Sequence, residues 1–242
     1  VSSLSHFCPA YTLRRERVMN FQTVFVIFPN LTQLDFTGPL QVLHRLPGST
    51  THIAARSRDP VPSDCGLWLL PTTTFAQCPQ ADLLCVPGGF GVSAAMADEE
   101  TLQFVRRQAE GARYVTSVCT GAFVLGAAGL LSGKRATTHW AYRHLLEKVG
   151  AVRSDARVVR DGNVFTGGGV TAGIDFAFTI AAEIAGLDIA QSIQLAIEYD
   201  PSPPFSAGSQ SSAPETVRSR VEGIYARRAA EFSAELDTVL LR

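Results

Sequence analysis

Residues 114–122 read YVTSVCTGA, and this stretch decides the fold that the sequence predicts. Residues 114–118 form a short apolar, β-branched run of the kind that makes a buried strand, and it leads directly into Cys119. Residues 121–131 are small or apolar and predict a helix that packs closely against its neighbours. Cys119 therefore stands where a strand turns into a helix.

The residues around Cys119 fit the spacing small–x–nucleophile–x–small, in which Ser117 and Gly121 are the small neighbours. Such an elbow is sharp and strained, so bulky flanking side chains would clash. Free N–H groups at the start of the helix favour a thiolate over a thiol. A free core cysteine is the alternative, and it is our interpretation of Cys78 and Cys85. For Cys119 the spacing favours a nucleophile.

Buried strands alternate with helices along the rest of the chain, which predicts an α/β fold with a mostly parallel sheet covered on both faces. Strands are expected at 21–28, 51–55, 67–70, 82–86 and in a hairpin at 158–166, and helices at 39–46 (opened by Pro39), 98–110, 140–149, 171–185 and 188–198. A last amphipathic helix carries Val217, Val221, Ile224, Phe232, Leu236 and Val239 at helical spacing. Its apolar stripe needs a surface, either the domain itself or a second subunit.

The composition suits one α/β domain, with 242 residues of which 46% are hydrophobic. A net charge of −1 and the lack of an 18-residue apolar run predict neither a nucleic-acid partner nor a membrane span. Five irregularly spaced cysteines without C-x-x-C argue against a disulfide framework or a zinc site, which favours a reducing, cytoplasmic compartment. Residues 1–18 lack hydrophobic periodicity and are expected to be a disordered or foreign extension, with one domain over 19–242.

A glycine loop, PGG at 87–89, follows the strand that ends at residue 86. The carboxyl ends of parallel strands lie at one edge of a sheet, where ligands bind, so this loop should lie beside Cys119. The backbone N–H groups of Gly88 and Gly89 are candidates for an oxyanion hole. An ordinary turn is the alternative interpretation.

A second glycine loop, GGG at 167–169, precedes Val170 and a helix. It lacks the Lys-Ser/Thr of a P-loop and does not match a dinucleotide fingerprint. We interpret it as close backbone packing beside the pocket, with Gly168 and Val170 as candidate lining residues.

Asp35 follows the first predicted strand and should therefore lie at the same edge as Cys119. It is either the N-cap of the next helix or a carboxyl group near the thiol. A carboxylate and a thiolate at close range repel each other, so one of them should hold a proton. None of His44, His52, His139 and His144 is next to Cys119 in sequence, and we interpret these histidines as structural or exposed.

The chain resembles the ThiJ/PfpI superfamily, which has a flavodoxin-like fold with a cysteine elbow, and within it the isonitrile hydratases. The stretches that carry the resemblance are QLDFTGPLQVL (33–43), CVPGGFGV (85–92), YVTSVCTGAFVLGAAGLLSGKRATTHWAY (114–142), RDGNVFTGGGVTAGIDFA (160–177) and EYDPSPPFSAG (198–208). The superfamily often has Glu after the first strand, whereas Asp35 matches the hydratases. Its proteases and deglycases have His after the nucleophile, where this chain has Thr120.

The resemblance implies that Cys119 is the nucleophile, that Asp35 is the general acid, and that Thr120 and Gly89 line the site. It also implies an isonitrile and water as substrates, a homodimer and no cofactor. The sensor domains of AraC-type regulators share SVCTGAF and ATTHWAY, but the chain after Pro214 is short and its charges are mixed. An amidase-like cysteine hydrolase is a third possibility, and it needs a Cys–His–Glu triad that the sequence does not indicate.

Overall fold

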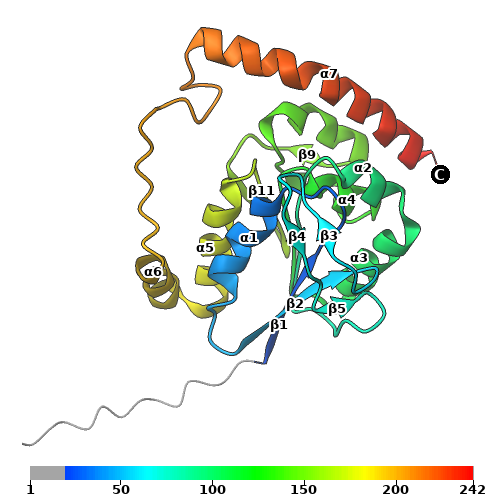
Figure 1. The fold of residues 1–242 in the computed structure, drawn as a ribbon, viewed down its shortest axis with the longest axis vertical. Coiled ribbons are helices and arrows are strands. Elements are labelled where there is room, and N and C mark those ends of the chain that lie inside the picture. Colours follow the sequence, from blue (N-terminus) through cyan, green and yellow to red (C-terminus); the bar gives the residue numbers. More distant parts are fainter. Residues whose placement is uncertain (1–19, 242) are drawn as a thin grey trace, which may run out of the picture.

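The computed structural model describes residues 20–241, and the extension predicted for residues 1–18 lies outside them. A seven-stranded sheet forms the centre, in the order β10-β11-β7-β6-β1-β2-β5 (Figure 1). Every pairing in it is parallel except that between β10 and β11. Its strands are β1 (Phe21–Val26), β2 (Ser49–Ala55), β5 (Thr73–Thr74), β6 (Leu83–Val86), β7 (Tyr114–Val118), β10 (Val158–Asp161) and β11 (Val164–Gly167).

Helices cover both faces of this sheet, which confirms the predicted α/β class (Figure 1). One face carries α1 (Gln33–Leu43), α5 (Ala172–Ala185) and α6 (Leu187–Ala196). The other carries α2 (Val92–Ala97), α3 (Glu99–Gly111) and α4 (Gly121–Ala127). The remaining elements are the 3₁₀ helix η1 (Trp140–Val149), the long helix α7 (Glu215–Leu240), and the short pairs β3 (Val61–Pro62) with β4 (Trp68–Leu69) and β8 (Arg135–Ala136) with β9 (Val152–Arg153).

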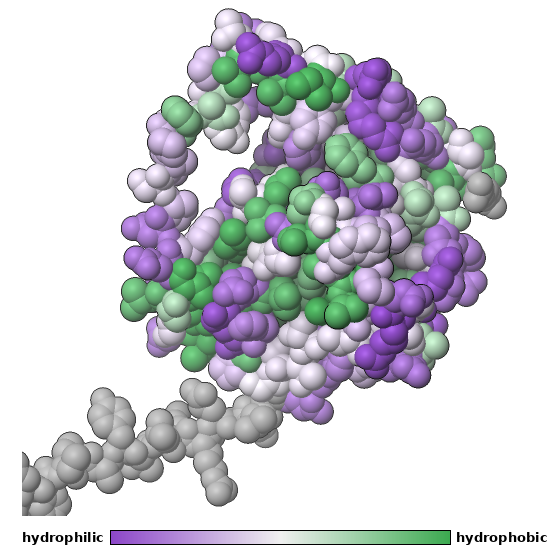
Figure 2. Space-filling view, in the orientation of Figure 1, coloured by the Kyte–Doolittle hydropathy of each residue, from purple (hydrophilic) through white to green (hydrophobic). Residues whose placement is uncertain are grey.

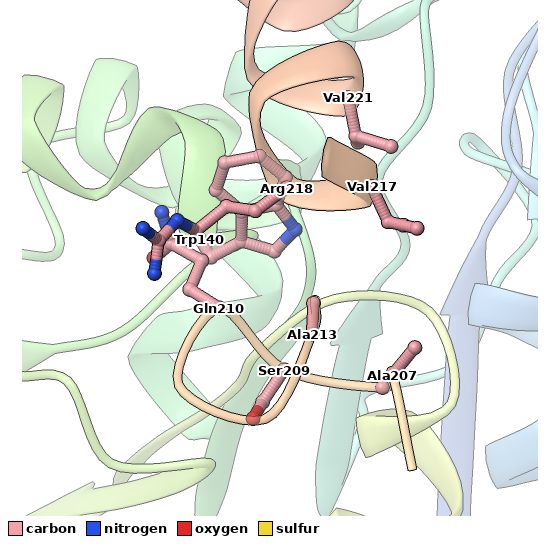
Figure 3. Close-up of a pocket in the computed structure, with 9 residues that line it drawn as sticks. Trp140, Ala207, Ser209, Gln210, Ala213, Val217, Arg218 and Val221 are labelled. Atoms are coloured by element: carbon pink, nitrogen blue, oxygen red, sulfur yellow. The ribbon is translucent and has the colours of Figure 1, made fainter. Parts of the chain in front are cut away.

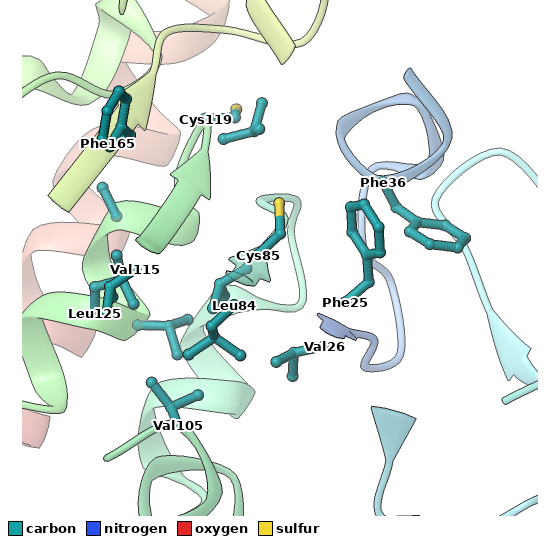
Figure 4. Close-up of a cluster of buried hydrophobic side chains, with 14 of the residues drawn as sticks. Phe25, Val26, Phe36, Leu84, Cys85, Val105, Val115, Cys119, Leu125 and Phe165 are labelled. Atoms are coloured by element: carbon teal, nitrogen blue, oxygen red, sulfur yellow. The ribbon is translucent and has the colours of Figure 1, made fainter. Parts of the chain in front are cut away.

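The core lies between the central strands and these helices, and it includes two cysteines. All four residues of β6 and all five of β7 are buried, as expected for parallel strands covered on both faces. Cys85 of β6 is buried among apolar side chains, and Figure 4 shows Cys119 beyond the end of β7. Burial raises the pKa of Cys85 to about 12 and that of the half-buried Cys78 to about 11. Both thiols pack against the core, as their sequence context predicted.

The prediction that Pro39 opens a helix is wrong, because α1 begins at Gln33 and Pro39 lies inside it. Proline inside a helix removes a backbone donor, so this position needs compensation from packing. Pro39 is buried and its ring packs against Gly173 of α5, where a Cβ atom would lie 3.2 Å from Pro39 Cδ. The earlier start places Asp35 in the first turn of α1 rather than in front of it.

Helix α7 lies across η1 and α2 and is joined to α6 by an extended segment, residues 197–214 (Figure 1). This segment is mostly exposed and stands away from the body of the protein in Figure 2. Figure 3 shows Trp140 of η1 beside the first turns of α7 and the loop before it, around a cavity of about 90 Å³. Within residues 20–241, no helix is both long enough and apolar enough to cross a membrane.

The predicted apolar stripe of α7 is buried at one end only. Phe232 and Leu236 are 3% and 0% exposed, and Phe232 packs edge-on against Phe123 of α4 with ring centroids 4.9 Å apart. Ile224 and Val217 are 67% and 40% exposed. The domain therefore covers the carboxyl half of the stripe, and the first half faces outward.

We predict that Leu236→Ala lowers the free energy of unfolding by about 2–5 kcal/mol, because it leaves a cavity in a filled core. Ile224→Ala removes a comparable aliphatic group from an exposed position of the same helix and should change stability by about 0.5 kcal/mol or less. Urea denaturation of the two variants measures both effects. Equal losses would mean that α7 is not anchored through Leu236.

Candidate active site

Four segments meet at the carboxyl edge of the sheet because the strands that precede them are parallel neighbours. Val86 of β6 pairs with Ser117 of β7, and Val118 pairs with Gly167 of β11, so the residues that follow lie side by side. The backbone N–H of Cys119 donates to the carbonyl oxygens of Gly167 and Gly168, at 3.0 and 2.9 Å. The prediction that the loops after β6 and β7 share this edge is confirmed.

Cys119 occupies a strained elbow between β7 and α4. Its φ of 57° lies in the left-handed region, which costs a residue with a Cβ atom free energy. A Cβ atom at Gly121 would lie 2.2 Å from the carbonyl oxygen of Val86, so nothing larger than glycine fits two residues after the cysteine. Thr138 Oγ1 donates to the carbonyl oxygen of Cys119 at 2.6 Å and helps to fix the turn.

Asp35 is fully buried beside this elbow. The N–H of Gly88 donates to Asp35 Oδ2 at 3.0 Å, and within residues 20–241 Oδ1 has no hydrogen-bond partner. Loss of hydration raises the pKa of Asp35 to about 7, against the smaller lowering effects of the Gly88 amide and the Cys119 thiol. The side chain caps no helix N-terminus, so the N-cap alternative is wrong.

The glycine at position 88 is required by the closeness of two site residues. A Cβ atom there would lie 2.6 Å from the backbone nitrogen of Thr120 and 2.8 Å from Asp35 Oδ2. The N–H groups of Gly88 and Gly89 donate to Asp35 Oδ2 and Thr120 Oγ1, both at 3.0 Å. These two amides therefore hold the side chains of Asp35 and Thr120 in place.

The ionisation of Cys119 is governed by its burial and by Asp35. Burial and the nearby carboxyl group raise the pKa of the thiol, whereas the N–H groups of Thr120 and Val170 lower it by donating to the sulfur. The helix N–H groups that the sequence predicted at the sulfur are present, but burial outweighs them and raises the pKa of the thiol overall. Since both acids resist ionisation, the pair retains at least one proton at neutral pH.

A cavity of about 170 Å³ opens in front of the cysteine. Of the residues singled out from the sequence, Cys119, Thr120, Gly89 and Val170 line it. Gly88 and Gly168 stand behind this wall, where they contact Asp35 and the backbone of Cys119. Val170, like Cys119, has a positive φ, of 20°, so two strained residues face the same space.

Sequence reasoning missed the opposite wall of the cavity, which is largely aromatic and comes from η1 and α7. It contains Tyr142, Tyr225, Arg228, Phe232 and His139, and Thr32, Asp64 and Phe90 complete the lining. The ATTHWAY stretch of the resemblance was a signal for residues 139 and 142. The spacing of α7 predicted an apolar stripe, but nothing in it places that helix over Cys119.

His139 therefore belongs to the site, and its interpretation as a structural or exposed residue was incomplete. Its Nδ1 accepts a hydrogen bond from the N–H of Ala141 at 3.3 Å, and burial lowers its pKa to about 4, so the ring is neutral. No hydrogen bond joins His139 to Cys119 in the described part of the chain. Nor do residues 20–241 contain a cluster of three or more His, Cys, Asp or Glu side chains that would hold a metal ion.

We predict that Asp35→Asn gains stability relative to the wild type as the pH rises. The folded protein holds the Asp35 proton up to about pH 7, whereas the usual pKa is 3.8, so folding loses stability through Asp35 as the pH rises through that interval. Asparagine carries no such proton. The unfolding free energy of Asp35→Asn minus that of the wild type should therefore increase from about pH 4 to about pH 7 and then level off.

Urea denaturation at several pH values measures this difference, with the exposed Asp200→Asn as a control. A difference between wild type and Asp35→Asn that does not change with pH would show that the Asp35 pKa is not raised.

Known proteins share this architecture and much of this sequence. The chain is 59% identical over 199 residues to a Pseudomonas putida protein named isonitrile hydratase, which covers 82% of this chain and 87% of that protein. A crystal structure of a ThiJ/PfpI family protein from Pseudomonas syringae superimposes with a TM-score of 0.88 at 42% identity, over 98% of this chain and 97% of the other.

A transcriptional regulator is a more distant relative. The HTH-type regulator GbdR of Pseudomonas aeruginosa is 27% identical over 185 residues, which cover 73% of this chain and 50% of the regulator. The DJ-1/PfpI family as a whole matches residues 22–183, which include Asp35, Gly88, Cys119 and Val170. The fold, the elbow and this match lead to one conclusion: the chain belongs to the DJ-1/PfpI family.

Proposed function

We propose that this protein hydrates isonitriles, R–N≡C, to N-substituted formamides, with Cys119 as a covalent nucleophile. The observation that carries the proposal is the buried Cys119–Asp35 pair at a strained elbow, where Cys119 lines a cavity and Asp35 lies buried behind it. The named activity of the Pseudomonas putida relative selects this reaction from those that a thiol and a carboxylic acid can perform together.

In the first step, Cys119 reacts as a thiolate, in the form of the pair whose one remaining proton is on Asp35, and its sulfur attacks the terminal carbon of the isonitrile. The attack creates negative charge on that carbon, and the carboxyl group of Asp35 delivers a proton to it as the C–S bond forms. The product is a thioimidate, R–N=CH–S–Cys119. The raised pKa of Asp35, about 7, suits this role because a substantial fraction of the group still carries its proton near neutral pH.

In the second step, water adds to the carbon of the thioimidate. The Asp35 carboxylate left by the first step accepts a proton from that water, which restores the acid for the next cycle. The hydroxyl proton of the tetrahedral intermediate passes to the nitrogen, and collapse of the intermediate breaks the C–S bond and releases the formamide and the Cys119 thiolate. The N–H groups of Thr120 and Val170 stabilise the departing thiolate, since both donate to the sulfur.

Thr120 also has a positioning role in this proposal. Its hydroxyl accepts the N–H of Gly89 at 3.0 Å, so the residue after the nucleophile ties α4 to the loop after β6. Gly88, Gly89 and Gly168 keep the backbone close enough for this arrangement, and Val170 closes the cavity beside the sulfur.

The homodimer and the cytoplasmic location implied by the resemblance are part of the same proposal. Leu195 and Phe205 are 83% and 78% exposed on α6 and on the segment that follows it, which leaves apolar surface that a second copy would cover. No nucleic acid and no membrane take part.

DNA binding is the second candidate, because the regulator GbdR is a relative. The net charge of −1 does not favour it. Sequence-selective retention of duplex DNA in a gel-shift assay would support regulation over catalysis. The amidase alternative lacks support from the site, since no histidine hydrogen-bonds Cys119 in the described residues.

Incubation of the protein with cyclohexyl or benzyl isonitrile, followed by mass spectrometry, tests the proposal. We expect the corresponding formamide from the wild type and none above background from Cys119→Ser, whereas Cys65→Ser, which alters an exposed thiol, should keep full activity. Asp35→Asn should slow turnover by about 10²–10⁴-fold, and Asp35→Glu should lose less because the acid is retained. Full activity of Cys119→Ser would contradict the proposal.

A further inference from the structure

Two tyrosines face Cys119 from the opposite wall of the cavity. Tyr142 comes from η1 and Tyr225 from α7, and their ring centroids lie 6.1 Å apart with perpendicular planes. His139 packs against Tyr225 at 4.9 Å, and Phe232 packs edge-on against Tyr142 at 5.4 Å. The two rings are therefore held in place by neighbouring aromatic rings.

Neither phenol hydroxyl has a hydrogen-bond partner within residues 20–241. A buried tyrosine hydroxyl usually has one, as Tyr199 does by donating to Asp175 Oδ1 at 2.7 Å. The hydroxyls of Tyr142 and Tyr225 are not among the fully enclosed unpartnered atoms either, so each keeps some exposed surface, and both residues line the cavity in front of Cys119. They form a pair of unused donors in front of the nucleophile.

The charged donor on this wall is already engaged. The guanidinium of Arg228 donates twice to Glu235, at 2.9 and 3.0 Å, and once to Ser93 Oγ at 3.2 Å. Burial raises the pKa of both phenols, and the nearby Cys119 adds to this rise. Both phenols therefore keep their protons at neutral pH and line the same cavity as the reacting sulfur.

The proposed reaction needs a donor here because the nitrogen changes character after the first step. In an isonitrile the nitrogen lone pair is shared with carbon, so the nitrogen accepts hydrogen bonds poorly. Attack by Cys119 gives a thioimidate whose nitrogen has a free lone pair, and this nitrogen must gain a proton before the product forms. A donor placed at this point stabilises the intermediate and not the substrate, which accelerates the reaction.

Resting on the proposed function, we propose that the Tyr142–Tyr225 pair is the proton donor to the substrate nitrogen. As water adds to the thioimidate carbon, one water proton goes to the Asp35 carboxylate and a phenol proton goes to nitrogen, which gives R–NH–CH(OH)–S–Cys119. The hydroxyl proton then returns to the phenolate as the C–S bond breaks. The sum is R–NC plus water giving R–NH–CHO, with both acids restored.

The assignment makes α7 part of the active site, since Tyr225 reaches the cavity from a helix about a hundred residues after the nucleophile in the sequence. Leu236 and Phe232 bury the far half of α7 in the core and so fix the helix that carries Tyr225 to this cavity. A residue in a terminal helix thus completes a site that is otherwise built at one edge of the sheet.

Phenylalanine variants test the pair: Tyr142→Phe, Tyr225→Phe and the double variant, with Tyr199→Phe as the matched control outside the site. Turnover of benzyl isonitrile gives kcat, and intact-protein mass spectrometry after rapid acid quench gives the fraction of enzyme that carries the thioimidate. We expect kcat to fall about tenfold in at least one single variant and by about 10²-fold or more in the double variant. Because the first step does not use the phenols, the Cys119 adduct should accumulate in these variants.

The possible outcomes separate this inference from the proposed function. Slow turnover with an accumulated adduct, beside normal kinetics of Tyr199→Phe, supports the tyrosine pair. Wild-type kcat in a folded double variant, without extra adduct, would overturn the inference and leave the hydratase proposal intact. A wild-type enzyme that makes no formamide would overturn both. If the double variant fails to fold, the two single variants give the same decision.

Discussion

The site depends on the burial of one carboxyl group against one thiol. Asp35 has no exposed surface and Cys119 only 6%, so bulk solvent does little to stabilise a charge on either group. The pKa of Asp35 rises to about 7, and that of Cys119 rises as well. The pair therefore keeps one proton close to the nucleophile. The proposed reaction requires this, because the isonitrile carbon gains both a sulfur and a proton in the first step.

The fold around the pair consists of features that bring the two groups together. Parallel pairing of β1, β6, β7 and β11 places four loops at one edge, and the glycines at 88 and 121 occupy positions where a Cβ atom would collide. The positive φ of Cys119 is strain that the surrounding hydrogen bonds maintain, including that from Thr138. Packing and hydrogen bonds in the folded protein thus stabilise a backbone geometry that the isolated segment would not adopt.

Much of this arrangement could be predicted from the sequence because it depends on local patterns. The strand–Cys119–helix junction, the glycine loop after β6 and the position of Asp35 after β1 are each visible within about ten residues. The start of α1 was misplaced because Pro39 is tolerated through its contact with Gly173, which is more than a hundred residues away in sequence. The aromatic wall was missed for the same reason: Tyr225 meets Cys119 only through tertiary packing. The pKa of the thiol depends on burial, which local sequence does not encode.

The most direct measurement of the central claim follows thiolate absorbance against pH in wild type and Asp35→Asn, with Cys119→Ser subtracted to isolate the one thiol. If Asp35 and Cys119 are coupled through space, removal of the carboxyl group eliminates a repulsion, and Cys119 should ionise at a lower pH in Asp35→Asn than in wild type. Identical titration curves for the two proteins would contradict the coupling, and with it the account of a shared proton.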